Sequence, residues 1–164
     1  MNVEFVEMSD PFLNDAAEIY NYYVRNTTVT FHTEEMTGEE MKDILYQHDT
    51  LYVSYAILNE GEFVGYAYMA PYKKRQAYRV SSEVTLYIKP ECCAKGIGSH
   101  ALTLLEANAK KKGIRTLLAV VCSENAASIK LFLKNGYEKS AHLKEVGMKF
   151  NRLLDIVILQ KIME

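Results

Sequence analysis

The chain has no excess of basic residues, and this argues against a large class of functions. Its 164 residues include 19 Lys and Arg against 21 Asp and Glu, which gives a formal net charge of -2. Proteins that bind nucleic acid usually present a basic surface, because they neutralise backbone phosphates. We therefore expect no nucleic-acid partner, and any basic site must be local.

Cysteine is scarce, and long apolar runs are missing. The three cysteines are the adjacent pair Cys92 and Cys93 and the distant Cys122, a spacing that suits neither a disulfide framework nor a zinc site. The four histidines show no metal-ligand pattern either. There is no stretch of about 18 apolar residues and no signal-peptide pattern at the amino terminus. These absences predict a cytoplasmic protein without a metal and without a membrane contact.

What the chain does have is an ordinary globular composition, with 49% hydrophobic and 24% charged residues. A chain of this length can bury one substantial core. No linker or repeat divides it, so residues 1–164 are predicted to form a single domain. The fold class predicted is α/β, with one mixed sheet and helices on both faces, because strands and helices do not alternate regularly.

The predicted elements follow from apolar periodicity and from capping and turn residues. A helix is expected to begin after a cap at Ser9 or Asp10, and a shorter one at Thr37, where Thr37 and Glu40 resemble a capping box; this second helix is expected to end near His48. The turn 59–61 indicates a hairpin. Strands are predicted over 3–8, 52–58, 62–70, 80–89, 116–122, 137–146 and 154–162, and the later helices over 97–112 and 125–134.

Residues 90–99, Pro-Glu-Cys-Cys-Ala-Lys-Gly-Ile-Gly-Ser, join a predicted strand to a predicted helix. Glycines allow a ligand to approach the backbone, and the free N–H groups at a helix start attract anions. A phosphate cradle and an ordinary glycine-bearing turn both fit this short pattern. Two other phosphate-binding patterns are missing, namely Gly-x-x-x-x-Gly-Lys-Ser/Thr and Gly-x-Gly-x-x-Gly with a downstream acid.

Residues 93–98 resemble the Gln/Arg-x-x-Gly-x-Gly/Ala loop with which GNAT acetyltransferases bind the pyrophosphate of coenzyme A. Residues 123–129 and 134–137 are similar to the strand end, helix and turn that follow in that family. Other segments resemble its phosphinothricin acetyltransferase branch, namely 16–24 with 27–31, 71–79, and 144–150 with 154–155. The likeness covers nearly the whole chain and implies the GNAT fold, a single mixed and mostly antiparallel β-sheet with helices on both faces.

This resemblance implies that acetyl-CoA is the cosubstrate, and it assigns the contacts to three segments. The contacts are Leu86, Tyr87 and Ile88 on the strand, Ala94, Lys95, Gly96, Ile97, Gly98 and Ser99 in the loop, and Asn125, Ser128 and Phe132 on the next helix. The last three residues are spaced so that they share a helix face. Asparagine is also favoured at helix starts, so a capping role for Asn125 stays open.

Glu83 lies on the less apolar face of the strand predicted over 80–89, together with Ser81, Thr85 and Tyr87. By itself this pattern favours a solvated strand glutamate. Its place in the segment 77–83 resembles the part of the branch that bears the general base, which implies that Glu83 is catalytic. An ammonium must lose its proton before the amine attacks a thioester, and Glu83 can take that proton directly or through one water. The resemblance also implies that backbone N–H groups near Val84–Leu86 stabilise the oxyanion.

Two positions depart from the family pattern. Phe132 stands where GNAT enzymes usually have a tyrosine as general acid, and Cys93 replaces the Gln or Arg of the loop. The first departure leaves three alternatives: coenzyme A departs as a thiolate or takes a proton from water, since a thiol has a pKa of about 8.5, or Tyr137 or Tyr87 replaces the acid. The second removes a side-chain contact with phosphate.

Basic residues gather just before the predicted strand that carries Glu83, at Lys73, Lys74, Arg75 and Arg79. Arginine and lysine suit an anionic amino acid, although a charge run is more often a solvated turn. The resemblance selects Lys73, Arg75 and Tyr78 as substrate contacts. Phe31 is a further candidate, because the aromatic set Phe31, Tyr72 and Tyr78 suits a wall of the site, although aromatic side chains are more often core. Lys149 and Arg152 are expected in a loop before the last strand, at the rim of the site or at a dimer contact.

Together these features predict an N-acetyltransferase that transfers acetyl from acetyl-CoA to the α-amino group of a small amino acid or analogue, of the phosphinothricin or methionine sulfone and sulfoximine type. By resemblance, the protein is expected to be a homodimer. One alternative is a non-catalytic acetyl-CoA sensor, suggested by Phe132 and Cys93. Another is acetylation of a protein amino terminus or a polyamine, the latter disfavoured by the basic cluster.

Overall fold

The computed structural model describes residues 1–164. Its strands are β1 (Val3–Glu7), β2 (Ser54–Asn59), β3 (Glu62–Pro71), β4 (Ser81–Ile88), β5 (Thr116–Cys122), β6 (Glu138–Lys149) and β7 (Arg152–Ile162). Its α-helices are α1 (Leu13–Asn26), α2 (Lys42–Leu45), α3 (Ile97–Lys111) and α4 (Ala126–Lys134). Short 3-10 helices cover Asp10–Phe12, Gln76–Val80 and Pro90–Cys92. None of the helices is both long enough and apolar enough to cross a membrane.

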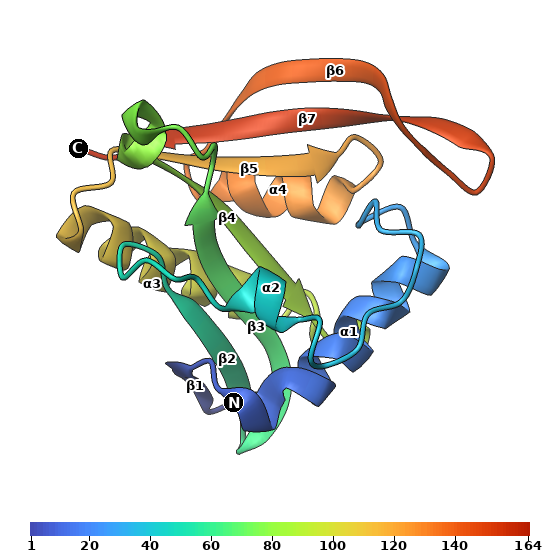
Figure 1. The fold of residues 1–164 in the computed structure, drawn as a ribbon, viewed down its shortest axis with the longest axis vertical. Helices are drawn as coiled ribbons and strands as arrows, with labels where there is room; N and C mark the ends of the chain where they lie inside the picture. Colours follow the sequence, from blue (N-terminus) through green and yellow to red (C-terminus); the bar gives the residue numbers. More distant parts are fainter.

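The seven strands form one sheet in the order β1-β2-β3-β4-β5-β7-β6 (Figure 1). All neighbouring strands are antiparallel except β4 and β5, which are parallel and are connected through α3. A parallel pair needs such a crossover, because no short turn can reverse the chain twice. The predicted mixed and mostly antiparallel sheet is therefore confirmed.

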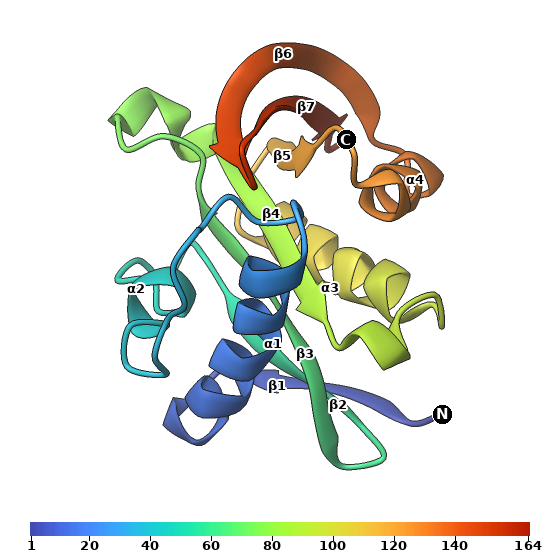
Figure 2. The same ribbon diagram turned by 90° about the vertical axis from the view of Figure 1, so that its right-hand side faces the viewer.

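Helices cover both faces of the sheet, as predicted. Figure 2 shows α1 and α2 on one side of β4 and α3 and α4 on the other. Each face has its own apolar core, because alternate residues of a strand point to opposite faces. Val84 and Ile88 of β4 join the core under α3 and α4, whereas Tyr87 packs against the core under α1. Residue Glu83 shares the parity of Tyr87, and the acidic side chain therefore lies on the α1 face.

The helix boundaries differ from the prediction in the first third of the chain. Ser9 precedes the 3-10 helix Asp10–Phe12 and makes no side-chain capping bond, and α1 begins only at Leu13. The capping box is confirmed, since Glu40 N donates to Thr37 Oγ1 at 3.2 Å and Thr37 N donates to Glu40 Oε2 at 2.7 Å. The α2 helix that follows ends at Leu45 rather than near His48. Short helices end early because few backbone bonds offset the ordering of the chain.

The last two strands are longer than predicted and form a tight hairpin. Phe150 and Asn151 make the turn, with φ values of 52° and 56°. A two-residue hairpin turn of type I′ requires this left-handed conformation at both central residues. Lys149 therefore ends β6 and Arg152 begins β7, and the expectation that both lie in a loop was wrong. Lys149, Asn151 and Arg152 concealed the ends of the strands, because polar residues at these positions indicated a loop.

A bulge in β6 is held by an acidic residue of β7. The register between the strands shifts between Leu143 and Gly147, and Glu145 has a φ of 56°. Asp155 fixes this irregular backbone, because its Oδ1 accepts from Glu145 N at 2.8 Å and its Oδ2 lies 2.7 Å from His142 Nε2. These two hydrogen bonds hold the pKa of Asp155 below its ordinary value.

Candidate active site

The parallel strands β4 and β5 pair over only three residues each. The ladder joins Ser81–Glu83 to Thr116–Leu118, and no pairing follows toward the carboxyl ends of the two strands. Strand β4 remains paired with β3 along its full length. Alternate residues of β4 therefore direct N–H and C=O groups away from β3 and into the gap.

A narrow cleft of about 60 Å³ occupies this gap. Its walls come from both separating strands, from α4 and from the loop after α1. The lining residues are Val29, Val84, Thr85, Leu86, Tyr87, Ala119, Val120, Val121, Asn125, Ser128 and Phe132. A cleft of this width, with apolar walls and unpaired backbone groups, suits a thin chain that carries amides, which is the chemical character of the pantetheine arm of coenzyme A.

The glycine-bearing loop lies between the carboxyl end of β4 and the start of α3. Ala94 and Gly96 both have left-handed backbones, with φ values of 60° and 83°, and Gly96 is the residue before the helix. A Cβ added to Gly96 would meet nothing within 4 Å, so this side of the loop is open. The open turn and the free N–H groups of the first helical turn form an anion cradle that fits a pyrophosphate.

Gly98 and Ser99 connect this loop to α4. A Cβ on Gly98 would stand 2.9 Å from Leu131 Cδ2, so glycine permits close packing of α3 on α4. Ser99 Oγ accepts from Asn135 Nδ2 at 3.1 Å, which joins the first turn of α3 to the end of α4. The two helices that flank the cleft are thus held at a fixed separation.

Asn125 both caps α4 and lines the cleft. Its Oδ1 accepts from Ser128 N at 3.1 Å, which is the capping bond that an asparagine at this position makes. The side-chain amide donates to no other group of the protein, so its N–H groups are free to meet a ligand. The two roles that the sequence left open are therefore compatible with each other.

Glu83 lies at the point where β4 and β5 begin to separate, paired with Leu118 on one side and Ala70 on the other. Its side chain is partly buried, and this desolvation raises the pKa of the carboxyl above its ordinary value of 4.5. The Lys73 ammonium acts in the opposite direction and favours the carboxylate. A partly buried carboxylate of raised basicity, next to the strand residues that line the cleft, is what a general base requires.

The basic segment before β4 divides into two parts. Arg79 is held in an ion pair with Asp49, away from the other basic residues. Lys73 lies near enough to Glu83 to lower its pKa and sits over the ring of Tyr72, 5.5 Å from its centroid. Arg75 and Tyr78 are exposed on the same segment, and the ring of Tyr78 packs edge-on against Tyr72 at 5.9 Å. None of these side chains lines the narrow cleft.

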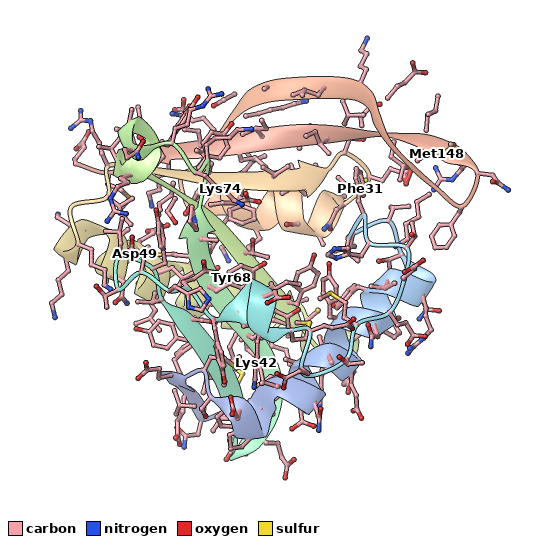
Figure 3. The ribbon with its side chains drawn as sticks, in the orientation of Figure 1. Phe31, Lys42, Asp49, Tyr68, Lys74 and Met148 are labelled. Carbon is pink, nitrogen blue, oxygen red and sulfur yellow. The ribbon has the colours of Figure 1, made fainter.

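Phe31 lies on the loop that follows α1 and faces the tip of the β6–β7 hairpin, where Met148 projects (Figure 3). Its ring packs over the backbone of Gly147 rather than into the cleft. Two residues earlier, Val29 does line the cleft. The loop 27–32 therefore joins the narrow cleft to the outer surface near the hairpin.

Phe132 packs inside the cleft wall and is 3% exposed. Its ring meets Tyr137 edge-on at a centroid distance of 5.0 Å. Tyr137 is buried behind it, where burial and the neighbouring Glu106 raise the pKa of its phenol, and it does not reach the cleft. Tyr87 does line the cleft, but its side chain packs on the α1 face with Tyr20, at 5.2 Å. Of the two tyrosines considered as replacement acids, only Tyr87 therefore borders the site.

Sequence reasoning missed three components of this site. Val29 and the strand residues Ala119–Val121 line the cleft, yet none carries a chemical group that singles it out. No sequence signal was available, because the uninterrupted apolar run 117–122 predicts a buried strand, whereas Val120 is 39% exposed in the structure. The burial of Lys149 is the third, since the sequence indicated only a place at the rim of the site or at a dimer contact.

The fold combines three features: two parallel strands that separate, a glycine-bearing helix start beside them, and a carboxylate of raised pKa where they separate. This combination is typical of an acyl-CoA-dependent transferase. Residues 9–158 match the family described as an acetyltransferase (GNAT) domain. The chain therefore belongs to the GNAT acetyltransferases and is an N-acetyltransferase.

Similar proteins indicate which branch of the GNAT family this chain resembles. The chain is 33% identical over 149 residues to the phosphinothricin N-acetyltransferase of Streptomyces coelicolor, covering 88% of this chain and 86% of that one. It is 28% identical over 163 residues to the L-methionine sulfoximine/L-methionine sulfone acetyltransferase of Salmonella typhimurium, covering 98% and 93%. A solved GNAT superfamily phosphinothricin acetyltransferase from Sinorhizobium meliloti, in complex with acetyl-CoA, superimposes with a TM-score of 0.91 at 28% identity, over 99% of this chain and 89% of that one.

Proposed function

We propose that this enzyme transfers the acetyl group of acetyl-CoA to the α-amino group of a small anionic amino acid or analogue, of the type represented by phosphinothricin, methionine sulfone and methionine sulfoximine. The observation that carries the proposal is the position of Glu83, where the two parallel strands separate and next to the Lys73 ammonium. The names of the relatives support the same class of acceptor.

Acetyl-CoA supplies the activated thioester, and the chain supplies the groups that hold it. Its pyrophosphate fits the backbone N–H groups of 94–99, and its pantetheine arm fits the cleft between β4 and β5 with Leu86, Tyr87, Ile88, Asn125, Ser128 and Phe132 beside it. Two features of the protein support this fit: the open left-handed turn at Gly96, and the unpaired backbone groups of β4 beyond Glu83.

In this proposal Glu83 removes a proton from the acceptor ammonium, directly or through one water, and the free amine attacks the thioester carbonyl. Backbone N–H groups of β4 near Val84–Leu86 then stabilise the negative charge that develops on the carbonyl oxygen. Phe132 cannot donate a proton, so the departing sulfur leaves as a thiolate or is protonated by water or by Tyr87.

The acceptor's own charges suit the outer side of Glu83. Lys73 and Arg75 are proposed to attract its carboxylate, with Tyr78 and Phe31 as apolar walls. We do not include Arg79 among these contacts, because its guanidinium is paired with Asp49. A cationic polyamine would be repelled by the same lysine and arginine.

We further propose that residues 1–164 act as one catalytic domain, that the enzyme works in the cytoplasm and that it forms a homodimer without nucleic acid, membrane or metal. Support for the dimer comes from apolar side chains that face solvent near the tip of the β6–β7 hairpin, at Val146, Met148, Phe150 and Leu153, each more than half exposed. An apolar surface of this kind is typical of an interface between chains. The three unpaired cysteines support a reducing compartment.

The test is acetyl-CoA-dependent acetylation, followed by mass, of a panel that contains phosphinothricin, methionine sulfone, methionine sulfoximine, a polyamine and a peptide. We expect a product from the three amino acid analogues. Glu83→Gln should lower kcat by about 10²- to 10⁴-fold, the range that a general base contributes. Glu138→Gln, on an exposed strand position, is the matched control and should retain full activity.

Two results would contradict the proposal. If no acceptor is acetylated while acetyl-CoA binds, the protein is a sensor rather than an enzyme of this type. If Glu83→Gln is as active as the control variant, another group is the base.

A further inference from the structure

Lys149 is a buried cation for which the proposed reaction has no use. It is 5% exposed, although it lies one residue from the turn of the β6–β7 hairpin. It takes part in none of the ion pairs of the protein. Burial without a carboxylate partner is costly for an ammonium and lowers the pKa of Lys149 below its ordinary value. A cost of this kind at one defined position calls for an explanation.

The one hydrogen bond that Lys149 makes is to the backbone of the loop after α1. Its Nζ donates to the carbonyl oxygen of Thr30 at 2.9 Å, across 119 residues of sequence. The same nitrogen lies 5.2 Å from the centroid of the Phe150 ring, a cation–π distance. Thr30 itself is buried, and its hydroxyl lies 2.7 Å from that of Tyr20. The loop is therefore bonded to α1 through Tyr20 and to the β6–β7 hairpin through Lys149.

A second, independent contact joins the same two segments. The ring of Phe31 rests on Gly147, so closely that a Cβ there would lie 2.5 Å from Cε2. A third contact passes through Glu124, which accepts from Thr28 Oγ1 at 3.1 Å and from both terminal nitrogens of Arg152. The loop 27–32 and the hairpin thus behave as one unit at the mouth of the cleft that Val29 lines.

We propose that Lys149 is a positioning residue: its buried ammonium fixes the Thr30 carbonyl and so holds Val29 and Phe31 in place as the wall between the cleft and the acceptor. The part of this proposal that concerns the acceptor rests on the proposed function, whereas the contact between Lys149 and Thr30 does not. It explains why a lysine occupies this place, since only a long side chain that ends in several donors reaches from the hairpin to the loop.

The contact is tested first by hydrogen exchange, which does not depend on catalysis. The variants are Lys149→Met, which keeps the length and removes the donors, and Lys149→Arg, which keeps donors. Lys139→Met, at an exposed position of the same strand, is the matched control. Loss of one hydrogen bond to a charged donor changes an opening equilibrium by about tenfold or more. We expect the amides of Val29 and His32, which donate to Thr27 Oγ1 and Thr30 Oγ1, to exchange about tenfold faster in Lys149→Met only, with exchange in α3 unchanged.

Kinetics then distinguish positioning from simple loss of stability. In Lys149→Met the KM of the acceptor should rise about tenfold, while the KM of acetyl-CoA stays within about twofold of the wild type. Lys149→Arg should recover part of the loss. A uniform loss of activity through lower folded fraction would leave both KM values unchanged and lower kcat alone, and this would overturn the proposal.

Three further outcomes support or overturn the role proposed for Lys149. If the wild type acetylates no acceptor but the exchange pattern appears, the proposed function fails and the contact stands. If Val29 and His32 exchange at the wild-type rate in Lys149→Met, the contact has no positioning role. Should that variant fail to fold, lysine-selective nitrogen labelling of the wild type takes its place: a slowly exchanging Lys149 ammonium with a cross-peak to Phe31 supports the proposal, and its absence overturns it.

Discussion

The ring of Phe31 and the backbone of Gly147 touch, with no room for a side chain between them. A Cβ atom on residue 147 would lie 2.5 Å from Cε2 and 2.7 Å from Cδ2 of the ring. The backbone of Gly147 does not need glycine for its φ angle, which is not positive. Glycine is required here because of the ring, and the two residues therefore pack as one unit, which we propose to face the acceptor.

Gly147→Ala should displace the Phe31 ring toward solvent. Overpacking typically costs about 1–3 kcal/mol, and we expect the low end, because Phe31 is 37% exposed and free to move outward. The KM of the acceptor should rise several-fold, whereas that of acetyl-CoA stays constant. Thermal melts and steady-state kinetics measure both effects.

A double-mutant cycle controls this prediction. In a Phe31→Ala background the alanine at 147 meets nothing, so the added substitution should cost little. Equal costs in the two backgrounds would show that the ring is not the reason for glycine at this position.

The pH dependence of kcat/KM should report Glu83. The acidic limb should have a midpoint above 4.5, because desolvation raises the pKa of this carboxyl and only the carboxylate accepts a proton. Lys73→Met should move the midpoint further up, since the ammonium of Lys73 favours the carboxylate. A midpoint that shifts downward in the lysine variant would contradict the assignment. Lys139→Met, distant on β6, should leave the profile unchanged.

Substitution of either glycine of the proposed phosphate cradle should weaken acetyl-CoA binding, for a different reason in each case. Gly96→Ala forces an alanine to a φ of 83°, which costs about 1–2 kcal/mol in the loop without any clash. Gly98→Ala brings a methyl to 2.9 Å from the Leu131 side chain and separates α3 from α4. Both should raise the KM of acetyl-CoA and leave the KM of the acceptor unchanged. The double variant Gly98→Ala, Leu131→Ala should recover binding, whereas Gly96→Ala has no such rescue.

Cys93→Arg should strengthen acetyl-CoA binding. The thiol now lies 3.8 Å from Tyr23 Oη and donates to the carbonyl oxygens of Ile88 at 3.8 Å and Lys89 at 3.5 Å, and thiol hydrogen bonds of this kind are weak. An exposed arginine beside the cradle adds a charge-assisted hydrogen bond to phosphate, which we expect to lower Kd by up to about tenfold at low ionic strength. Titration at two salt concentrations is the measurement, and Cys93→Ser is the control. A gain that is independent of salt would point to packing instead of charge.

The sequence predicted the order of the elements and the sheet because apolar periodicity acts locally. The strand over 116–122 and the helix over 126–134 appear almost where their patterns indicate. The open turn before α3 was also predicted, although its glycines alone fitted an ordinary turn as well as a phosphate cradle, and only the resemblance to the GNAT loop favoured the cradle. The role of Asn125 required the structure, because capping and ligand contact demand the same residue type.

What the sequence did not reveal depends on contacts between distant segments. Lys149 and Thr30 are 119 positions apart, and neither has neighbours that indicate burial. The separation of Arg79 from the other basic residues depends on Asp49, which lies in a different loop. The early end of α2 and the length of the last hairpin were missed because propensity and polarity there are overruled by packing against the rest of the chain.

The short ladder between β4 and β5 has a thermodynamic consequence. With only three residue pairs between them, the two halves of the sheet share little direct backbone bonding, and much of what joins them at the cleft is whatever occupies it. A ligand that binds only the folded chain adds RT ln(1 + [L]/Kd) to its stability, about 2.7 kcal/mol at a hundredfold excess over Kd. Bound acetyl-CoA is therefore expected to raise the melting temperature of the enzyme, by an amount that grows with the concentration of the ligand.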